Sequence, residues 1–298
     1  MGLPLIFLLT IQLALCLFHY FCSDLTIGSG ISRAVKLHSM AGILFDEIVF
    51  GPVKSRRFGV SLGINLLPLH GKFCSFNCIY CECGLNEAKN KEKPVLFTAA
   101  QINASLQSRF EALKEGMLNP DNITFAGNGE PTLHPEFETI IENTILLRDK
   151  FFPQAHITVL SNATRLTHAN VIRALLRIDN NVLKLDAGSN STFLAINQPT
   201  YPITLEKIIE ELKGFGGNLV IQTMLIRGEV EGKRVDNTTE EELTLWLGHI
   251  NEIKPKLVML YPIDRQTPYN TLEKVPETEF QALAKRIELL GIKAEVFY

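Results

Sequence analysis

Short runs of β-branched and other apolar residues alternate along the chain with longer stretches in which apolar residues recur every three or four positions. The first kind of run predicts buried strands, and the second predicts amphipathic helices. Strands are expected at 59–67, 122–126, 156–161, 182–186, 219–226, 256–261 and 293–297. Helices are expected at 99–117, 136–150, 168–178, 205–213, 240–253 and 277–290. Two of the helices open with the form of a capping box, Thr98-x-x-Gln101 and Thr239-x-x-Glu242.

Six strand–helix units follow one another without a break, and this alternation predicts parallel strands joined by right-handed crossovers. We therefore expect an α/β fold whose sheet is either open and doubly wound or wrapped toward a barrel. In both cases ligands bind at the carboxyl ends of the strands, so functional side chains should follow the strand runs. No Ser/Gly-rich linker interrupts this part of the chain, which indicates one domain over 40–298.

Residues 3–22 break this pattern, because all twenty lack formal charge. As a helix they would be about 30 Å long, which matches the hydrocarbon core of a bilayer. One interpretation is a membrane anchor, and the Lys and Arg residues that follow it would keep the domain in the cytoplasm. The other is that Met40 is the natural start, so that 1–39 is upstream sequence from a wrongly placed start. Both interpretations predict a cytoplasmic domain, and a membrane is a partner only under the first.

The composition, with 46% apolar and 20% charged residues among 298, excludes a disordered or collagen-like chain. The formal net charge of −3 does not favour a nucleic-acid partner, because phosphate binding needs an excess of Lys and Arg. A local basic patch stays open as an alternative, and the run Lys54-Ser-Arg-Arg57 is the best candidate for it. The same run is equally well explained as an exposed turn.

Four of the six cysteines, Cys74, Cys78, Cys81 and Cys83, lie within ten residues directly after the first expected strand. A disulfide framework is disfavoured, because neighbouring cysteines at these spacings bridge with strain and the domain is expected in the cytoplasm. A structural zinc site usually has two separated ligand pairs, and no second Cys/His pair follows. An iron–sulfur cluster is favoured, because C-x3-C-x2-C supplies three thiolates on one loop. Three thiolates leave one iron of a four-iron cluster open to a substrate or cofactor.

The cysteine spacing, together with the aromatic Tyr80 directly before the third cysteine, resembles the signature of the radical S-adenosylmethionine (SAM) superfamily. A segment after the next strand, Asn128-Gly129-Glu130, resembles the Gly-Gly-Glu segment with which that family contacts SAM. The resemblance implies a partial (β/α)6 TIM-like barrel with parallel strands and a [4Fe-4S] cluster held by three cysteines. The implied cluster ligands are Cys74, Cys78 and Cys81, and the implied SAM contacts are Tyr80, Asn128, Gly129 and Glu130.

Three further polar residues lie at or after strand ends. Asn162 follows the third strand, where its amide would bind the ribose or carboxylate of SAM or, alternatively, cap a turn before Thr167. Lys184 and Asp186 alternate with two leucines on the fourth strand, so both should face the barrel interior. There they are either catalytic residues or a buried scaffold pair.

The resemblance implies reductive cleavage of SAM at the cluster, which yields a 5′-deoxyadenosyl radical that abstracts hydrogen from an unidentified substrate. A one-electron donor such as a flavodoxin or ferredoxin is then the expected partner. Segments 51–59, 61–68, 129–134 and 184–187 resemble the wyosine-synthetase-like subgroup, so a tRNA-modifying enzyme is one alternative. Against it, the tRNA-modifying members carry a second cluster on extra cysteines, and only Cys83 is to spare. The other alternative is an iron–sulfur or zinc protein without SAM chemistry.

Overall fold

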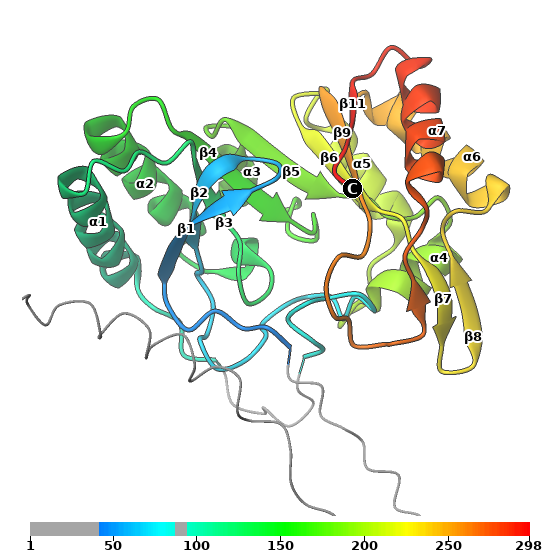
Figure 1. Cartoon of the computed structure of the whole chain (residues 1–298), viewed down its shortest axis with the longest axis horizontal. Coiled ribbons are helices and arrows are strands. Elements are labelled where there is room, and N and C mark those ends of the chain that lie inside the picture. Colours follow the sequence, from blue (N-terminus) through cyan, green and yellow to red (C-terminus); the bar gives the residue numbers. More distant parts are fainter. Residues whose placement is uncertain (1–41, 87–93) are drawn as a thin grey trace, which may run out of the picture. The chain divides into compact units, whose positions relative to one another are not determined.

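The fold is described from a computed structural model, in which residues 42–86 and 94–298 are placed (Figure 1). The predicted apolar segment 3–22 and the predicted boundary between 1–39 and 40–298 lie outside the described residues. Among the helices that are described, none combines the length and the apolar character needed to cross a bilayer.

One eight-stranded sheet lies at the centre of the fold, in the order β1-β2-β3-β4-β5-β6-β9-β11. The strands from β2 to β11 are parallel to their neighbours, whereas β1 pairs antiparallel with β2. Their bounds are β1 Val49–Ser55, β2 Gly59–Ile64, β3 Asn122–Phe125, β4 His156–Ser161, β5 Asn180–Lys184, β6 Val220–Met224, β9 Leu257–Tyr261 and β11 Ala294–Val296. The seven predicted strands are all present. The parallel order confirms the α/β class and is consistent with a partial TIM-like barrel.

Helices connect the parallel strands, as the alternation predicted. Their bounds are α1 Ala99–Glu115, α2 Phe137–Phe151, α3 Ala169–Leu175, α4 Asn190–Asn197, α5 Leu205–Lys213, α6 Glu240–Ile253 and α7 Glu277–Glu288, with a short 3-10 turn η1 Pro131–Leu133. The six predicted helices are all present. The sequence pattern missed α4, because its eight residues are too few to establish a helical period.

The two faces of the sheet differ in polarity, because successive side chains of a strand point to opposite faces. On one face Leu62, Ile123 and Ile157 lie in register across three strands and are buried in the main hydrophobic core with the apolar side of α1. The opposite face carries buried polar side chains, among them Ser61, Thr124, Thr158, Lys184 and Gln222. A polar face of this kind beside the strand ends is where a polar ligand would lie.

The turn between β1 and β2 folds over this polar face (Figure 1, blue hairpin). Phe58 of the turn packs against an apolar cluster formed by Val182, Val220 and Met259 of β5, β6 and β9. Beside it, Arg57 Nη1 donates to Gln222 Oε1 at 3.2 Å. The sequence did not predict β1, because an edge strand with mixed exposure has no clear period of two.

A three-stranded sheet in the order β10-β7-β8 extends from the end of β6, with β7 Arg227–Val230, β8 Lys233–Asp236 and β10 Leu272–Glu273. The sequence pattern missed it, because strands of two to four residues are too short to show a period of two.

The two predicted capping boxes differ in outcome. Thr98 and Gln101 form a complete one. Thr239 caps α6, but the Glu242 carboxylate accepts instead from the main-chain N–H groups of Gly188 (2.9 Å) and Ser189 (3.1 Å).

The complete capping box on α1 gives a stability prediction. Thr98 Oγ1 accepts from Gln101 N at 3.2 Å, and Gln101 Oε1 accepts from Thr98 N at 2.8 Å. Thr98→Ala removes one of these bonds, so we expect the free energy of unfolding to fall by about 1 kcal/mol. Urea denaturation followed by circular dichroism measures the change. Thr98→Ser, which keeps the hydroxyl, is the matched control, and equal stability of Thr98→Ala and Thr98→Ser would contradict the cap.

Candidate active site

The cysteine loop follows β2 and is hydrogen-bonded on both sides. On one side Phe73 N donates to Asn128 O (2.8 Å) and Glu130 N donates to Phe73 O (3.1 Å), which forms a parallel bridge with the loop after β3. On the other side Asn77 N donates to Asn197 O (3.0 Å) at the end of α4. These main-chain bonds fix the loop between two segments that lie far from it in the sequence.

The three predicted cluster ligands lie on this loop together with a lysine. Cys78 is buried, and Cys74 and Cys81 are half-buried. Burial alone would lower the pKa of Lys72, but the nearby Cys81, Cys74 and Cys78 raise it above the usual value. The Lys72 ammonium thus interacts electrostatically with all three thiols, and it also donates to the Gly84 carbonyl at 2.9 Å. Lys72 was not among the predicted site residues, although it stands two residues before the first cysteine.

The thiols differ in how readily they lose a proton. Burial raises the pKa of Cys74 to about 12 and also raises that of Cys78. The neighbouring Cys83 thiol and the Lys72 ammonium lower the pKa of Cys81. The binding of iron would therefore release protons from Cys74 and Cys78. Across 42–86 and 94–298, no three His, Cys, Asp or Glu side chains converge as they would around a single metal ion.

Glu130 joins the ends of β3 and β4. Its Oε1 accepts from Thr132 N (3.1 Å), Thr132 Oγ1 (2.5 Å) and Ser161 Oγ (2.8 Å), and its Oε2 accepts from Asn162 N (2.6 Å). Burial raises the pKa of this carboxyl, whose residue is only 2% exposed. Four accepted bonds use about all the acceptor sites of a carboxylate. The predicted contact of Glu130 with SAM stays a prediction, and the structure gives the side chain a connecting role.

Asn128 and Gly129, the other two residues of this segment, both take part in close contacts with main-chain groups. Asn128 Nδ2 donates to Phe45 O and Pro68 O, both at 2.8 Å, so its side chain points to the start of the cysteine loop. Gly129 has a φ of 141°, and a Cβ there would lie 1.9 Å from the Phe73 carbonyl oxygen. Only glycine allows this approach. The SAM contacts of Asn128 and Gly129 stay predictions, and the Asn128 side chain is already engaged by main-chain groups.

Asn162 caps a turn, as one of its two predicted roles requires, and also contacts the cysteine loop. Its Oδ1 accepts from Thr164 N (3.1 Å) and Thr164 Oγ1 (2.7 Å), which caps a turn that starts closer than the predicted Thr167. Its Nδ2 donates to Ser75 Oγ (2.8 Å) and to Cys74 Sγ (3.6 Å). The amide thus lies beside the cysteine loop, while its contact with SAM stays a prediction.

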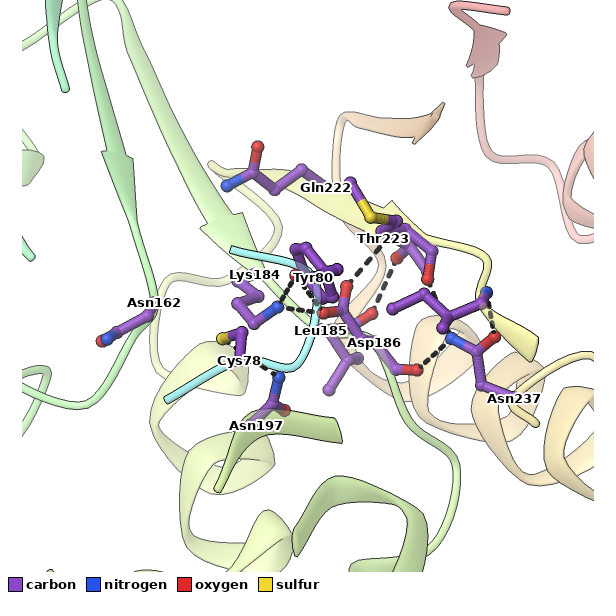
Figure 2. A network of polar contacts seen from close by, with 12 residues as sticks. Cys78, Tyr80, Asn162, Lys184, Leu185, Asp186, Asn197, Gln222, Thr223 and Asn237 are labelled. Atoms are coloured by element: carbon purple, nitrogen blue, oxygen red, sulfur yellow. Dashed lines mark hydrogen bonds and ion pairs between the residues drawn. The ribbon is translucent and has the colours of Figure 1, made fainter. Parts of the chain in front are cut away.

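Lys184 and Asp186 face the same side, as predicted, and meet Tyr80 there (Figure 2). Asp186 Oδ2 accepts from the Lys184 ammonium and from Tyr80 OH (2.5 Å), and Oδ1 accepts from Met224 N (3.0 Å). Burial alone would lower the pKa of Lys184, but the Asp186 carboxylate holds it well above its usual value. The pair is a buried ion pair next to Cys78, which satisfies the scaffold interpretation and leaves the catalytic one a prediction.

Arg57 is a site residue that the sequence analysis took for part of a surface turn or a basic patch. Its guanidinium carbon lies 5.3 Å from the ring centres of both Phe58 and Tyr261, and burial lowers its pKa. Gln222, which accepts the hydrogen bond from Arg57, lies on β6 and pairs with Lys184 of the adjacent strand β5. Among the described residues Arg57 forms no ion pair, whereas the adjacent Arg56 pairs with Asp264 at 2.8 Å. The polar face therefore carries the cations of Arg57 and Lys184 together with the carboxylate of Asp186.

Comparison with known proteins identifies relatives of the chain. The Radical SAM superfamily profile matches residues 69–237. A UPF0026 protein of Methanocaldococcus jannaschii is 31% identical over 251 residues, which cover 82% of this chain and 72% of that protein. A protein of Brachyspira hyodysenteriae named GTPase Obg is 31% identical over 80% of this chain, but the chain spans only 33% of its length. A radical SAM methyltransferase structure from Sphaerobacter thermophilus is similar in fold, with TM-score 0.59, 17% identity, and coverage of 80% and 66% of the two chains.

The four hydrogen bonds to Glu130 give a second prediction. Glu130→Gln keeps the shape but turns an amide N–H2 toward a main-chain or hydroxyl donor, so at least one buried donor loses its acceptor. We expect the free energy of unfolding to fall by about 1–3 kcal/mol in the apoprotein, measured by urea denaturation. Glu142→Gln, which removes a surface ion pair with Arg177, is the control and should cost less than about 1 kcal/mol. A Glu130→Gln variant no less stable than this control would refute the connecting role.

Proposed function

Because the chain belongs to the radical SAM superfamily, we propose that it is an enzyme that cleaves SAM reductively and abstracts hydrogen from a substrate bound on the polar face of the sheet. Family membership implies SAM and a [4Fe-4S] cluster as cofactors, and it implies an electron donor and a substrate as partners. When bound, the cluster and SAM together supply a 5′-deoxyadenosyl radical. We assign the role of electron donor to a flavodoxin or ferredoxin.

The donor set of the cysteine loop carries this proposal. Cys74, Cys78 and Cys81 are three thiols on one loop, held from both sides by main-chain hydrogen bonds. Buried thiolates need compensation for their charge, and Lys72 interacts electrostatically with all three. Amide N–H groups of two asparagines also point at two of the sulfurs. These features suit a cluster with three protein ligands and one open iron.

The charges on the polar face support the placement of the substrate. Lys184 and Asp186 neutralise one another beside Cys78, but Arg57 has no carboxylate partner among the described residues. Arg57 is half-buried, and a cation partly removed from water without a counter-ion is unfavourable, so an anionic group of the substrate would stabilise it. We therefore propose a substrate with a carboxylate or phosphate group that contacts Arg57 and Gln222, with Lys184 and Asp186 as catalytic residues closer to the cysteine loop.

The SAM chemistry is tested by anaerobic reconstitution with iron and sulfide, followed by addition of dithionite and SAM. We expect 5′-deoxyadenosine and methionine as products, measured by liquid chromatography and mass spectrometry. The variant with Cys74, Cys78 and Cys81 all changed to Ala should lose both the iron and the products. Cys83→Ala is the matched control, and it should keep the iron and sulfide content. No products, together with a cluster spectrum unchanged by SAM, would favour an iron–sulfur protein without SAM chemistry.

The substrate class is tested by the response of the melting temperature to anions. Succinate and inorganic phosphate serve as carboxylate and phosphate probes, and a probe at ten times its Kd should stabilise the protein by about 1.4 kcal/mol. We expect this gain to disappear in Arg57→Gln and to persist in Arg56→Gln, the control that changes the exposed neighbour. Equal gains in both variants would contradict the role of Arg57. Modified nucleosides of tRNA from cells with and without the gene test the wyosine-type alternative.

A further inference from the structure

Asn197 is the last residue of α4 and is only 1% exposed. Its main-chain oxygen accepts from Asn77 N at 3.0 Å, and the preceding Ile196 O accepts from Ile79 N at 3.0 Å. Both neighbours of Cys78 are therefore bonded to the last residues of α4. This double contact fixes the register of Cys78 against Asn197, independently of the Asn197 side chain.

Within that register the Asn197 amide points at the sulfur (Figure 2). Its Nδ2 donates to Cys78 Sγ at 3.6 Å, and this is the one hydrogen bond of the side chain among the described residues. Cys78 is the most buried of the three predicted ligands. In a site shielded from water a hydrogen bond is electrostatically stronger than in solvent. The contact with Cys78 therefore has a larger electrostatic effect than the same contact would have on an exposed sulfur.

A donor directed at a ligand sulfur affects the redox states of an iron–sulfur cluster unequally. One-electron reduction adds a negative charge that is spread over the cluster and its thiolates. An N–H dipole that points at a sulfur stabilises the reduced state more than the oxidised state, so it raises the reduction potential. Asn162 has the corresponding contact with Cys74, also at 3.6 Å, but it binds Ser75 and Thr164 as well. Asn197 is therefore the donor whose electrostatic effect can be separated from the structure of the loop.

We infer that Asn197 is a positioning residue that raises the reduction potential of the cluster through its hydrogen bond to Cys78, and so eases reduction by the one-electron donor. The inference rests on the proposed function, because it takes Cys78 as a cluster ligand. It does not depend on which substrate the enzyme uses. The effect belongs to a side chain that lies 119 residues from the cysteine it contacts.

The test is a redox titration of the reconstituted full-length protein, followed by electron paramagnetic resonance. Asn197→Leu has a similar shape without a donor, and Asn197→Asp places an acceptor against the thiolate. At the potential that half-reduces the wild-type cluster, we expect the ratio of reduced to oxidised cluster to fall about threefold to tenfold in Asn197→Leu. It should fall further in Asn197→Asp. Gln198→Met, which changes the next side chain, should keep the wild-type ratio.

Either Asn197 variant, if it has full iron and sulfide content and the wild-type ratio, overturns the inference. Loss of the cluster from both variants overturns it too, because Asn197 would then serve assembly rather than potential. A lowered ratio without production of 5′-deoxyadenosine by the wild-type protein would refute the proposed function and keep the inference. A wild-type protein that assembles no cluster would refute both.

Discussion

The site depends on one close approach of two backbones, that of Gly129 to the carbonyl of Phe73. Because no Cβ stands between them, the cysteine loop joins the end of β3 through a parallel bridge. Glu130, the next residue, then ties β3 to β4 through four accepted hydrogen bonds. Main-chain contacts with the end of β3 thus fix the position of the cysteine loop, which has no helix or strand of its own.

Charge is balanced differently in the two halves of the site. Around the thiols, Lys72 and two amide donors partly offset the burial that raises the pKa of Cys74 and Cys78. Beside them Lys184 and Asp186 form a neutral pair that also orients Tyr80. Further along the same face Arg57 is held by Gln222 and two aromatic rings, and it forms no ion pair with any residue that the structure describes. The thiols, the Lys184–Asp186 pair and the Arg57 guanidinium therefore differ in how far other residues balance their charge.

The sequence predicted what depends on local pattern and missed what depends on distant contacts. The parallel strands, six helices and the cysteine motif follow from period and spacing, and all were found. Lys184 and Asp186 were placed on one face by alternation alone. The roles of Arg57 and Asn197 could not be predicted, because each contacts a residue more than 100 positions away. Glu242 does not complete its predicted capping box, because its carboxylate accepts instead from two main-chain N–H groups of a loop that is distant in sequence.

The hydrogen bonds between the cysteine loop and the end of α4 can form only after α4 has been synthesised. Cys78 leaves the ribosome 119 residues before Asn197, which at about 5–20 residues per second is an interval of about 6–24 s. Before Asn197 is made, the contacts of the loop with Asn128, Asn162 and Asp186 are available, but those with the end of α4 are not. The contacts that bury Cys78 are therefore completed only after α4 has been synthesised. The complete set of hydrogen bonds around Cys78 thus requires synthesis of the chain at least as far as α4.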